Sequence, residues 1–190
     1  MININKWPVV IFASPRTGST AFGFHLLELN PEVRYFSEPN FDSSEMKEFI
    51  TFTNAKKNNY ILKLLGGSLN LYPPHIIAKI FSNEVFKIKI SRKNVVEQIA
   101  SHYIADHRGI WQYHNADDNY KELAINNIEI ELGLLRRSIA RVHWDNDIID
   151  KISSDLEFYY EDLLDIISPT KKTPLPTNYD LLIDTIKKLI

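Results

Sequence analysis

Short segments rich in apolar residues alternate along the chain with longer segments whose apolar residues recur at helical spacing. The short segments predict strands at residues 8–13, 33–36, 60–65, 85–90 and 156–160. The first of them is an unbroken apolar run, which is typical of a strand covered on both faces. The alternation predicts a three-layer α/β domain with a mainly parallel central sheet flanked by helices. In such a fold, ligands bind at the carboxyl ends of the strands.

Apolar residues at helical spacing predict helices in the segments between and after the strands. These helices are expected at residues 19–29, 42–56, 73–81, 120–143 and 179–190, with a short one after the last strand that ends at 167. Asp42 is expected to cap the second of them. Asn94, with Glu97 three residues later, predicts the cap of another helix whose apolar face runs from Val95 to Tyr103. We expect residues 105–119 to be irregular.

Composition narrows the class of protein. The 190 residues are 44% hydrophobic, which suits a single domain over residues 1–190 with a real core. The net charge of −2 argues against a globally basic nucleic-acid binder. Cysteine is absent, so disulfides and thiolate chemistry are excluded. No apolar run is long enough to span a membrane, and the first residues lack a signal-peptide pattern. A soluble cytoplasmic domain is expected, with its oligomeric state open.

The segment between the first strand and the first helix predicts a phosphate-binding loop. Its spacing matches G-x-x-x-x-G-K-[ST], but Ala13 replaces the first glycine and Ser19 replaces the lysine. Arg16 supplies a cation inside the loop instead. Backbone N–H groups at the start of the helix can still point at an anion. The expected phosphate-binding residues of this P-loop-like segment are Pro15, Arg16, Thr17, Gly18, Ser19 and Thr20.

A second strand end is also basic. The strand at 85–90 leads into Ser91, Arg92 and Lys93, where a magnesium–nucleotide enzyme needs an acidic residue. Cations at two strand ends predict a nucleotide with two separate phosphate groups, held without a divalent metal. His102, His107 and His114 match no common ligand spacing, so we expect them in a solvated segment and expect no metal site.

Together the two motifs resemble those of the sulfotransferase superfamily, which uses 3′-phosphoadenosine 5′-phosphosulfate (PAPS). In that family the 5′-phosphosulfate loop resembles residues 14–20, and the 3′-phosphate motif is a basic residue followed by a serine eight or nine positions later. Ser101 lies nine residues after Arg92 and eight after Lys93, so both remain candidates with Ser101. The resemblance implies PAPS as donor and adenosine 3′,5′-bisphosphate (PAP) as product.

Three further segments resemble the bacterial carbohydrate branch of that family, the trehalose sulfotransferase-like enzymes. They are residues 34–39, 109–111 and 160–164. The first carries Glu38 where that branch has its carboxylate base. The resemblance implies a small acceptor, a carbohydrate hydroxyl. It also suggests that Lys172 belongs to a cationic loop that closes over PAPS.

Sulfuryl transfer needs a cation on the leaving oxygen and a base for the acceptor proton. Arg16 is the candidate for the cation and Glu38 for the base. Lys63 matches a strand lysine of the cytosolic sulfotransferases, but Leu65 stands where those enzymes have a catalytic histidine. Because an unpaired charge inside a sheet is costly, we expect Lys63 at the carboxyl end of its strand or on an edge strand. Glu161 and Asp162 are interpreted as structural, with Asp162 capping a short helix.

Two other functions stay open at this level. One is a P-loop kinase in which Arg16 replaces the loop lysine, and magnesium dependence separates it from a sulfotransferase. The other is a module that binds PAP without turnover. The absence of the catalytic histidine favours this module, whereas Glu38 counts against it.

Overall fold

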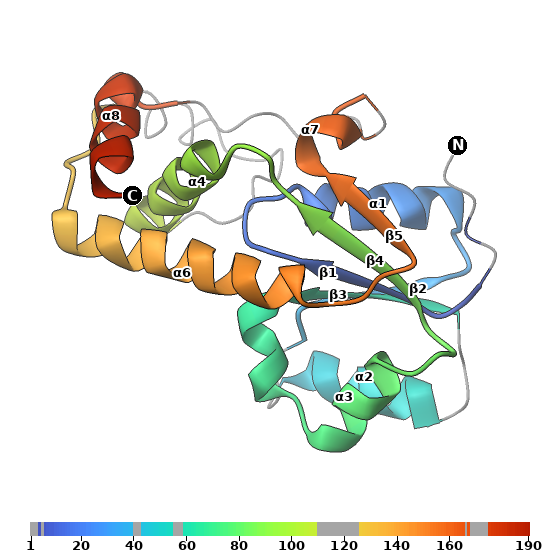
Figure 1. The fold of residues 1–190 in the computed structure, drawn as a ribbon. Coiled ribbons are helices and arrows are strands. Elements are labelled where there is room, and N and C mark those ends of the chain that lie inside the picture. Colours follow the sequence, from blue (N-terminus) through green and yellow to red (C-terminus); the bar gives the residue numbers. More distant parts are fainter. Residues whose placement is uncertain are drawn as a thin grey trace.

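Five parallel strands form the central sheet of the chain (Figure 1). The computed structural model describes residues 4, 6–39, 43–54, 59–109, 126–165, 167 and 175–190. The strands are β1 (Val9–Ala13), β2 (Arg34–Ser37), β3 (Tyr60–Leu65), β4 (Phe86–Ser91) and β5 (Leu156–Tyr159). Their order is β2-β3-β1-β4-β5, and every neighbouring pair is parallel. The predicted α/β fold with a mainly parallel sheet is confirmed.

Helices connect the strands and follow them. They are α1 (Ser19–Leu29), α2 (Ser44–Asn54), α3 (Pro74–Ile80), α4 (Val95–Arg108), α6 (Leu132–Asp150), α7 (Tyr160–Leu163) and α8 (Tyr179–Leu189), with the 3₁₀ helix η1 (Gly66–Leu71) after β3. All five strands lie within one residue of their predicted bounds. None of the described helices is long and apolar enough to cross a membrane.

Three apolar clusters join these elements. One face of the sheet packs against α1, as Phe22 and Leu26 meet Ile11 of β1. The opposite face is covered by α2 and α3, on the lower side of the sheet in Figure 1. The third cluster joins α4, α6 and α8, which gather beside the sheet. Helices therefore cover both faces of the sheet, as a three-layer fold requires.

The helix at 120–143 was predicted with the wrong bounds. The observed α6 runs from Leu132 to Asp150, and residues 126–131 are not helical. The non-helical segment is held by side chains from elsewhere, since the Tyr103 hydroxyl donates to Glu129 O at 2.7 Å and accepts from Glu131 N–H at 2.9 Å. The buried face of α6 includes the polar residues Ser138 and Asp145. The buried face of α6 therefore does not show an uninterrupted apolar repeat in the sequence, and the prediction ended the helix too early, at residue 143.

Other element ends also differ from the prediction. Helix α4 continues to Arg108 and ends at Gly109, whose φ of 66° lies in the left-handed region that glycine adopts without strain. Helix α7 ends at Leu163 rather than at 167. Asp42 lies outside the described residues, and Ser43 Oγ accepts the Met46 N–H at 3.1 Å at the start of α2. The Asn94 cap is confirmed, because its side chain accepts from Glu97 N–H at 3.1 Å.

Candidate active site

The loop from β1 to α1 has the backbone geometry of an anion site. Arg16 and Gly18 both have positive φ, at 64° and 69°. The turn is closed by the Thr17 hydroxyl, which donates to Ser14 O at 2.9 Å. Among the described residues, no side chain caps the N-terminus of α1, so no described side chain accepts from its first N–H groups. Ser14 Oγ is buried and has no hydrogen-bond partner among the described residues. This combination suits a bound phosphate or sulfate group.

Gly18 is needed for a close approach as well as for its positive φ. A Cβ atom at this position would lie 2.7 Å from Cδ2 of Tyr160, the first residue of α7. The Arg92 guanidinium lies over the same ring, 4.9 Å from its centroid. Tyr160 therefore lies between the phosphate loop and the basic turn after β4.

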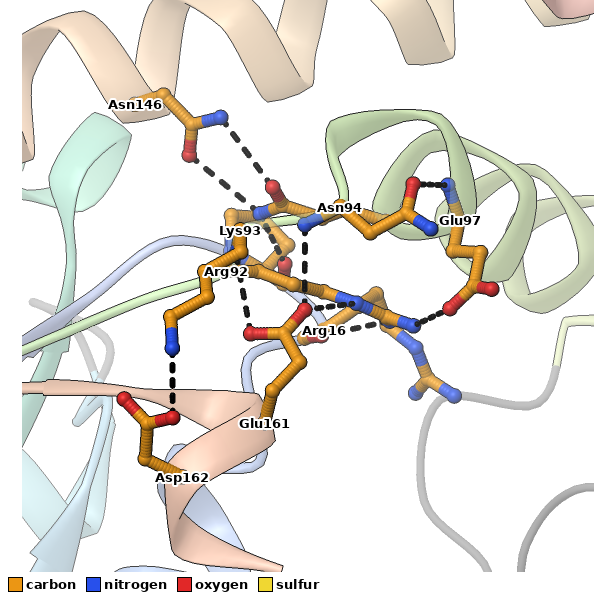
Figure 2. A network of polar contacts seen from close by, with 10 residues as sticks. Arg16, Arg92, Lys93, Asn94, Glu97, Asn146, Glu161 and Asp162 are labelled. Carbon is orange, nitrogen blue, oxygen red and sulfur yellow. Dashed lines mark hydrogen bonds and ion pairs between the residues drawn. The ribbon is translucent and has the colours of Figure 1, made fainter.

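The loop is in direct contact with α4 and with the basic turn that precedes this helix. Arg16 Nε donates to Ser101 Oγ at 2.9 Å, across 85 residues of sequence. Arg92 Nη1 approaches Arg16 O at 3.4 Å. The Gln98 amide donates to Pro15 O at 2.8 Å. Two motifs that the sequence places far apart thus meet at the carboxyl edge of β1 and β4, where Arg16 lies beside Arg92 (Figure 2).

Acidic side chains from α7 hold the basic turn. The Glu161 carboxylate accepts from the N–H groups of Lys93 at 3.0 Å and Asn94 at 3.1 Å, and lies 3.7 Å from Arg92 Nε (Figure 2). Burial alone raises the pKa of Glu161. The backbone donors and the Arg92 charge outweigh that effect and bring the pKa below its ordinary value. Arg92 also donates to Glu97 at 2.8 Å.

Lys93 turns away from the phosphate loop. Its Nζ donates to Asp162 at 2.6 Å and lies over the Tyr159 ring, 5.0 Å from the centroid. The hydrogen bond to Asp162 raises the pKa of Lys93. The interpretation of Asp162 as a helix cap was wrong, because it lies inside α7 and binds Lys93. Sequence reasoning also missed the contact of Glu161 with the basic turn.

Glu38, Lys63 and Thr20 form the second polar group at this edge. Glu38 follows β2, has a φ of 52°, and its N–H donates to Lys63 O at 2.9 Å. Its carboxylate forms an ion pair with Lys63 Nζ, which donates to Thr20 Oγ1 at 2.8 Å. The candidate base is thereby linked to the first turn of α1.

Of the two placements expected for Lys63, the edge strand was wrong, whereas its ammonium group does reach the carboxyl edge of the sheet, where it meets Glu38 and Thr20. β3 lies between β2 and β1, so it is not an edge strand, and Lys63 is only 3% exposed within it. Its backbone is in register with Ile11 and Ser37. The buried ammonium group is tolerated because Glu38 supplies the opposite charge and Thr20 accepts a hydrogen bond.

His102 is not in a solvated segment either. It lies on α4, is 7% exposed, and its Nδ1 is 3.2 Å from Ser138 Oγ of α6. Burial lowers its pKa to about 4. The charges of Arg141 and Arg16 act in the same direction, against that of Asp106. The signal available in the sequence was the spacing of Gln98 and His102, which puts polar groups on one face of α4.

Some predicted residues cannot be placed. Lys172 lies outside the described residues, as do His114 and residues 110–111. Within the described part of the chain, no group of three or more His, Cys, Asp or Glu side chains could hold a metal ion.

No protein-family model and no curated protein matches the chain. Among solved structures, the chain resembles the crystal structure of retinol dehydratase in a complex with retinol and PAP, with 16% sequence identity and a TM-score of 0.37. The match covers 94% of this chain and 59% of that one, so this chain spans about three fifths of that protein's length. The site is therefore described from this chain's own residues.

Proposed function

We propose that this chain is a sulfotransferase that moves the sulfuryl group of PAPS to a hydroxyl of a small, carbohydrate-like acceptor. The observation that carries the proposal is the hydrogen bond from Arg16 Nε to Ser101 Oγ. It brings the phosphate loop beside α4, the helix that follows the basic turn, and this supports two neighbouring sites, one for each phosphorylated end of the nucleotide.

Each phosphate group has its own residues in this proposal. The open N-terminus of α1 and the loop hydroxyls bind the 5′ end, and the Arg16 guanidinium stabilises the charge that grows on the leaving oxygen. Arg92 and Ser101 bind the 3′-phosphate. Between the two basic candidates, the contacts favour Arg92, because it lies against Arg16 whereas Lys93 is turned toward Asp162.

When bound, PAPS supplies the sulfuryl group, whose bond to the phosphate oxygen breaks as its bond to the acceptor oxygen forms. Glu38 accepts the proton of the acceptor hydroxyl. The ion pair with Lys63 keeps its carboxylate in place at the end of β2. Lys63 in turn holds Thr20, so the base and the phosphate loop are positioned by one buried ammonium group.

The test is a thermal-shift titration with PAP, AMP and ATP, with and without magnesium. PAP is expected to stabilise the protein without magnesium, by about 2.7 kcal/mol at 100 times its Kd. AMP is expected to do much less because it lacks the 3′-phosphate. Equal stabilisation by AMP would contradict the proposed 3′-phosphate site. Stabilisation only by ATP with magnesium would favour a P-loop kinase.

Two variants sharpen this test. Ser101→Ala is expected to weaken PAP binding by about 1.5–3 kcal/mol, the range for a hydrogen bond to a charged group. Thr185→Ala is the control, since among the described residues its hydroxyl bonds only to Leu181 O, on the exposed surface of α8. Transfer of labelled sulfate from PAPS to a panel of sugars then distinguishes an enzyme from a module that binds PAP without turnover.

A further inference from the structure

Helix α6 carries a fully buried carboxylate at the edge of the candidate site. Asp145 is 0% exposed, accepts the Gly67 N–H after β3, and accepts from Arg141 Nε at 2.5 Å. Burial raises the pKa of Asp145, and the nearby charge of Glu38 acts in the same direction. A buried carboxylate is costly unless it is paired. Arg141 is therefore held in one place by the requirement to neutralise Asp145.

Packing restrains the guanidinium of Arg141 further. It lies over the Trp144 ring, 5.1 Å from the centroid. Both side chains lie close to Gly67, where an added Cβ would be 2.6 Å from the Trp144 ring and 2.7 Å from Arg141 Nη2. Gly67 thus makes room for this pair of side chains at the end of β3.

The guanidinium of Arg141 has hydrogen-bond donors that the contact with Asp145 does not use. Its side chain is 40% exposed. Apart from the Nε contact with Asp145, its nitrogen atoms make no hydrogen bond within the described part of the chain. Lys63 and Arg92 differ from Arg141 in this respect, because Lys63 is paired with Glu38 and Arg92 with Glu97. Both terminal amino groups of a fixed, half-exposed guanidinium remain available to a ligand.

The position of this guanidinium is tied to the phosphate loop. Asn146, next to Asp145, donates to Gln98 Oε1 at 3.2 Å, and Gln98 donates to Pro15 O. Figure 2 shows Asn146 reaching from α6 toward this network. On the other side, Gly67 follows β3 four residues after Lys63, the partner of the candidate base. Glu38 is close enough to Asp145 for its charge to act on that carboxylate, which puts Arg141, the partner of Asp145, in the same part of the molecule as the candidate base.

We propose that Arg141 is a specificity-determining residue that binds an anionic group, a carboxylate or a sulfate, on the hydroxylated acceptor. The inference rests on the proposed function, since it assigns the acceptor class of the same site. An arginine fork binds two oxygens of such a group at once, and a fork that is already fixed loses little entropy on binding. A uronic acid has this chemistry, whereas a neutral sugar does not.

The test compares glucuronate with glucose, which differ in one carboxylate, by NMR titration with and without PAP. We expect the wild type to bind glucuronate about tenfold or more tightly than glucose. The variant Arg141→Gln/Asp145→Asn removes both charges yet keeps an oxygen that can accept the Gly67 N–H, and it is expected to lose this preference. Arg137→Gln, one turn earlier on the exposed surface of α6, is expected to keep it.

Two results overturn the proposal: glucuronate binding no tighter than glucose in the wild type, or a full preference retained by the folded double variant. Should that variant not fold, Arg141→Lys serves in its place, because lysine keeps the charge beside Asp145 but lacks the fork. A retained full preference in that variant also contradicts the proposal. The PAP thermal shift is scored separately. If the protein prefers glucuronate but does not bind PAP, the proposed sulfotransferase is contradicted and the anion site is retained. If it binds PAP but does not prefer glucuronate, the anion site is contradicted and the proposed sulfotransferase is retained.

Discussion

Arg16 and Glu38 are the two described residues other than glycine with positive φ. Such backbone conformations cost about 1–3 kcal/mol each and persist only where the surroundings hold them. Both residues follow a strand at its carboxyl end, Arg16 after β1 and Glu38 after β2. The strain is thus located at the two residues to which we assign the chemistry.

Different roles for these two residues predict different failures. Arg16→Ala removes the cation that we assign to the leaving oxygen and is expected to lower turnover by about 10² or more, with some loss of nucleotide affinity. Glu38→Gln removes the base and is expected to lower transfer by about 10²–10⁴ with PAP affinity almost unchanged. Steady-state kinetics and PAP titration measure the two effects. The acidic limb of the pH–rate profile is expected to vanish in Glu38→Gln.

A matched control for the base is Glu48→Gln, which changes an exposed carboxylate paired with Arg34 and is expected to leave transfer unchanged. Glu38→Gln also deprives the buried Lys63 of its counter-ion, so folding is checked by circular dichroism. Near-full activity with an unchanged pH profile in folded Glu38→Gln would show that Glu38 is not the base.

At the scale of elements, α7 determines how the turn from β4 to α4 is presented. Glu161 bonds to two backbone N–H groups of that turn and lies beside Arg92, so it is a positioning residue for the proposed 3′-phosphate site. Asp162 instead makes an exposed ion pair with Lys93. Exposed pairs contribute little to stability, so the two adjacent carboxylates have different expected effects.

Glu161→Gln is therefore expected to weaken PAP binding by about tenfold, the effect of one hydrogen bond to a charged group, while AMP binding stays unchanged. The ratio of the two affinities, measured by calorimetry, separates positioning of Arg92 from a general loss of structure. Asp162→Asn is the neighbouring control and is expected to keep the ratio. If Asp162→Asn instead lowered the ratio of PAP to AMP affinity and Glu161→Gln did not, binding of the 3′-phosphate would be assigned to Lys93 rather than to Arg92.

At the scale of the whole molecule, the polar contact between α4 and α6 makes stability depend on pH. His102 has a pKa of about 4 in the fold and about 6.5 when unfolded. Between these values the unfolded chain binds the proton and the folded protein does not. Stability attributable to His102 is therefore complete above about pH 6.5 and falls as the pH drops toward 4, by up to about 1.4 kcal/mol per pH unit.

His102→Gln keeps a group that can bond to Ser138 but does not titrate, so its stability is expected to fall less steeply in this window. Urea unfolding of both proteins at several pH values measures the difference. Other titrating groups contribute to both proteins and largely cancel. This includes Asp145, whose raised pKa acts in the opposite sense and favours the fold at acid pH. If the unfolding free energies of the wild type and of His102→Gln had the same slope against pH, His102 would have the same pKa in the folded and unfolded states.

Local patterns were sufficient for the strands and the Asn94 cap. A strand covered on both faces must be apolar throughout, and a cap needs one hydrogen-bonding side chain at one position. The bounds of α6 were not predictable in this way, because the residues it buries include Ser138 and Asp145, which are satisfied by His102 and Gly67 from other elements.

The sequence alone thus determined where the strands lie, the order of strands and helices along the chain, and which residue types could bind phosphate groups, because these properties depend on neighbours a few residues apart. The tertiary structure alone decided the strand order, the meeting of Arg16 with Ser101, the burial of Lys63 against Glu38, and the pairing of Arg141 with Asp145. Charged groups can be buried in this way only where distant segments supply their partners. No local pattern specifies those partners, because they come together only when the sheet and its covering helices pack.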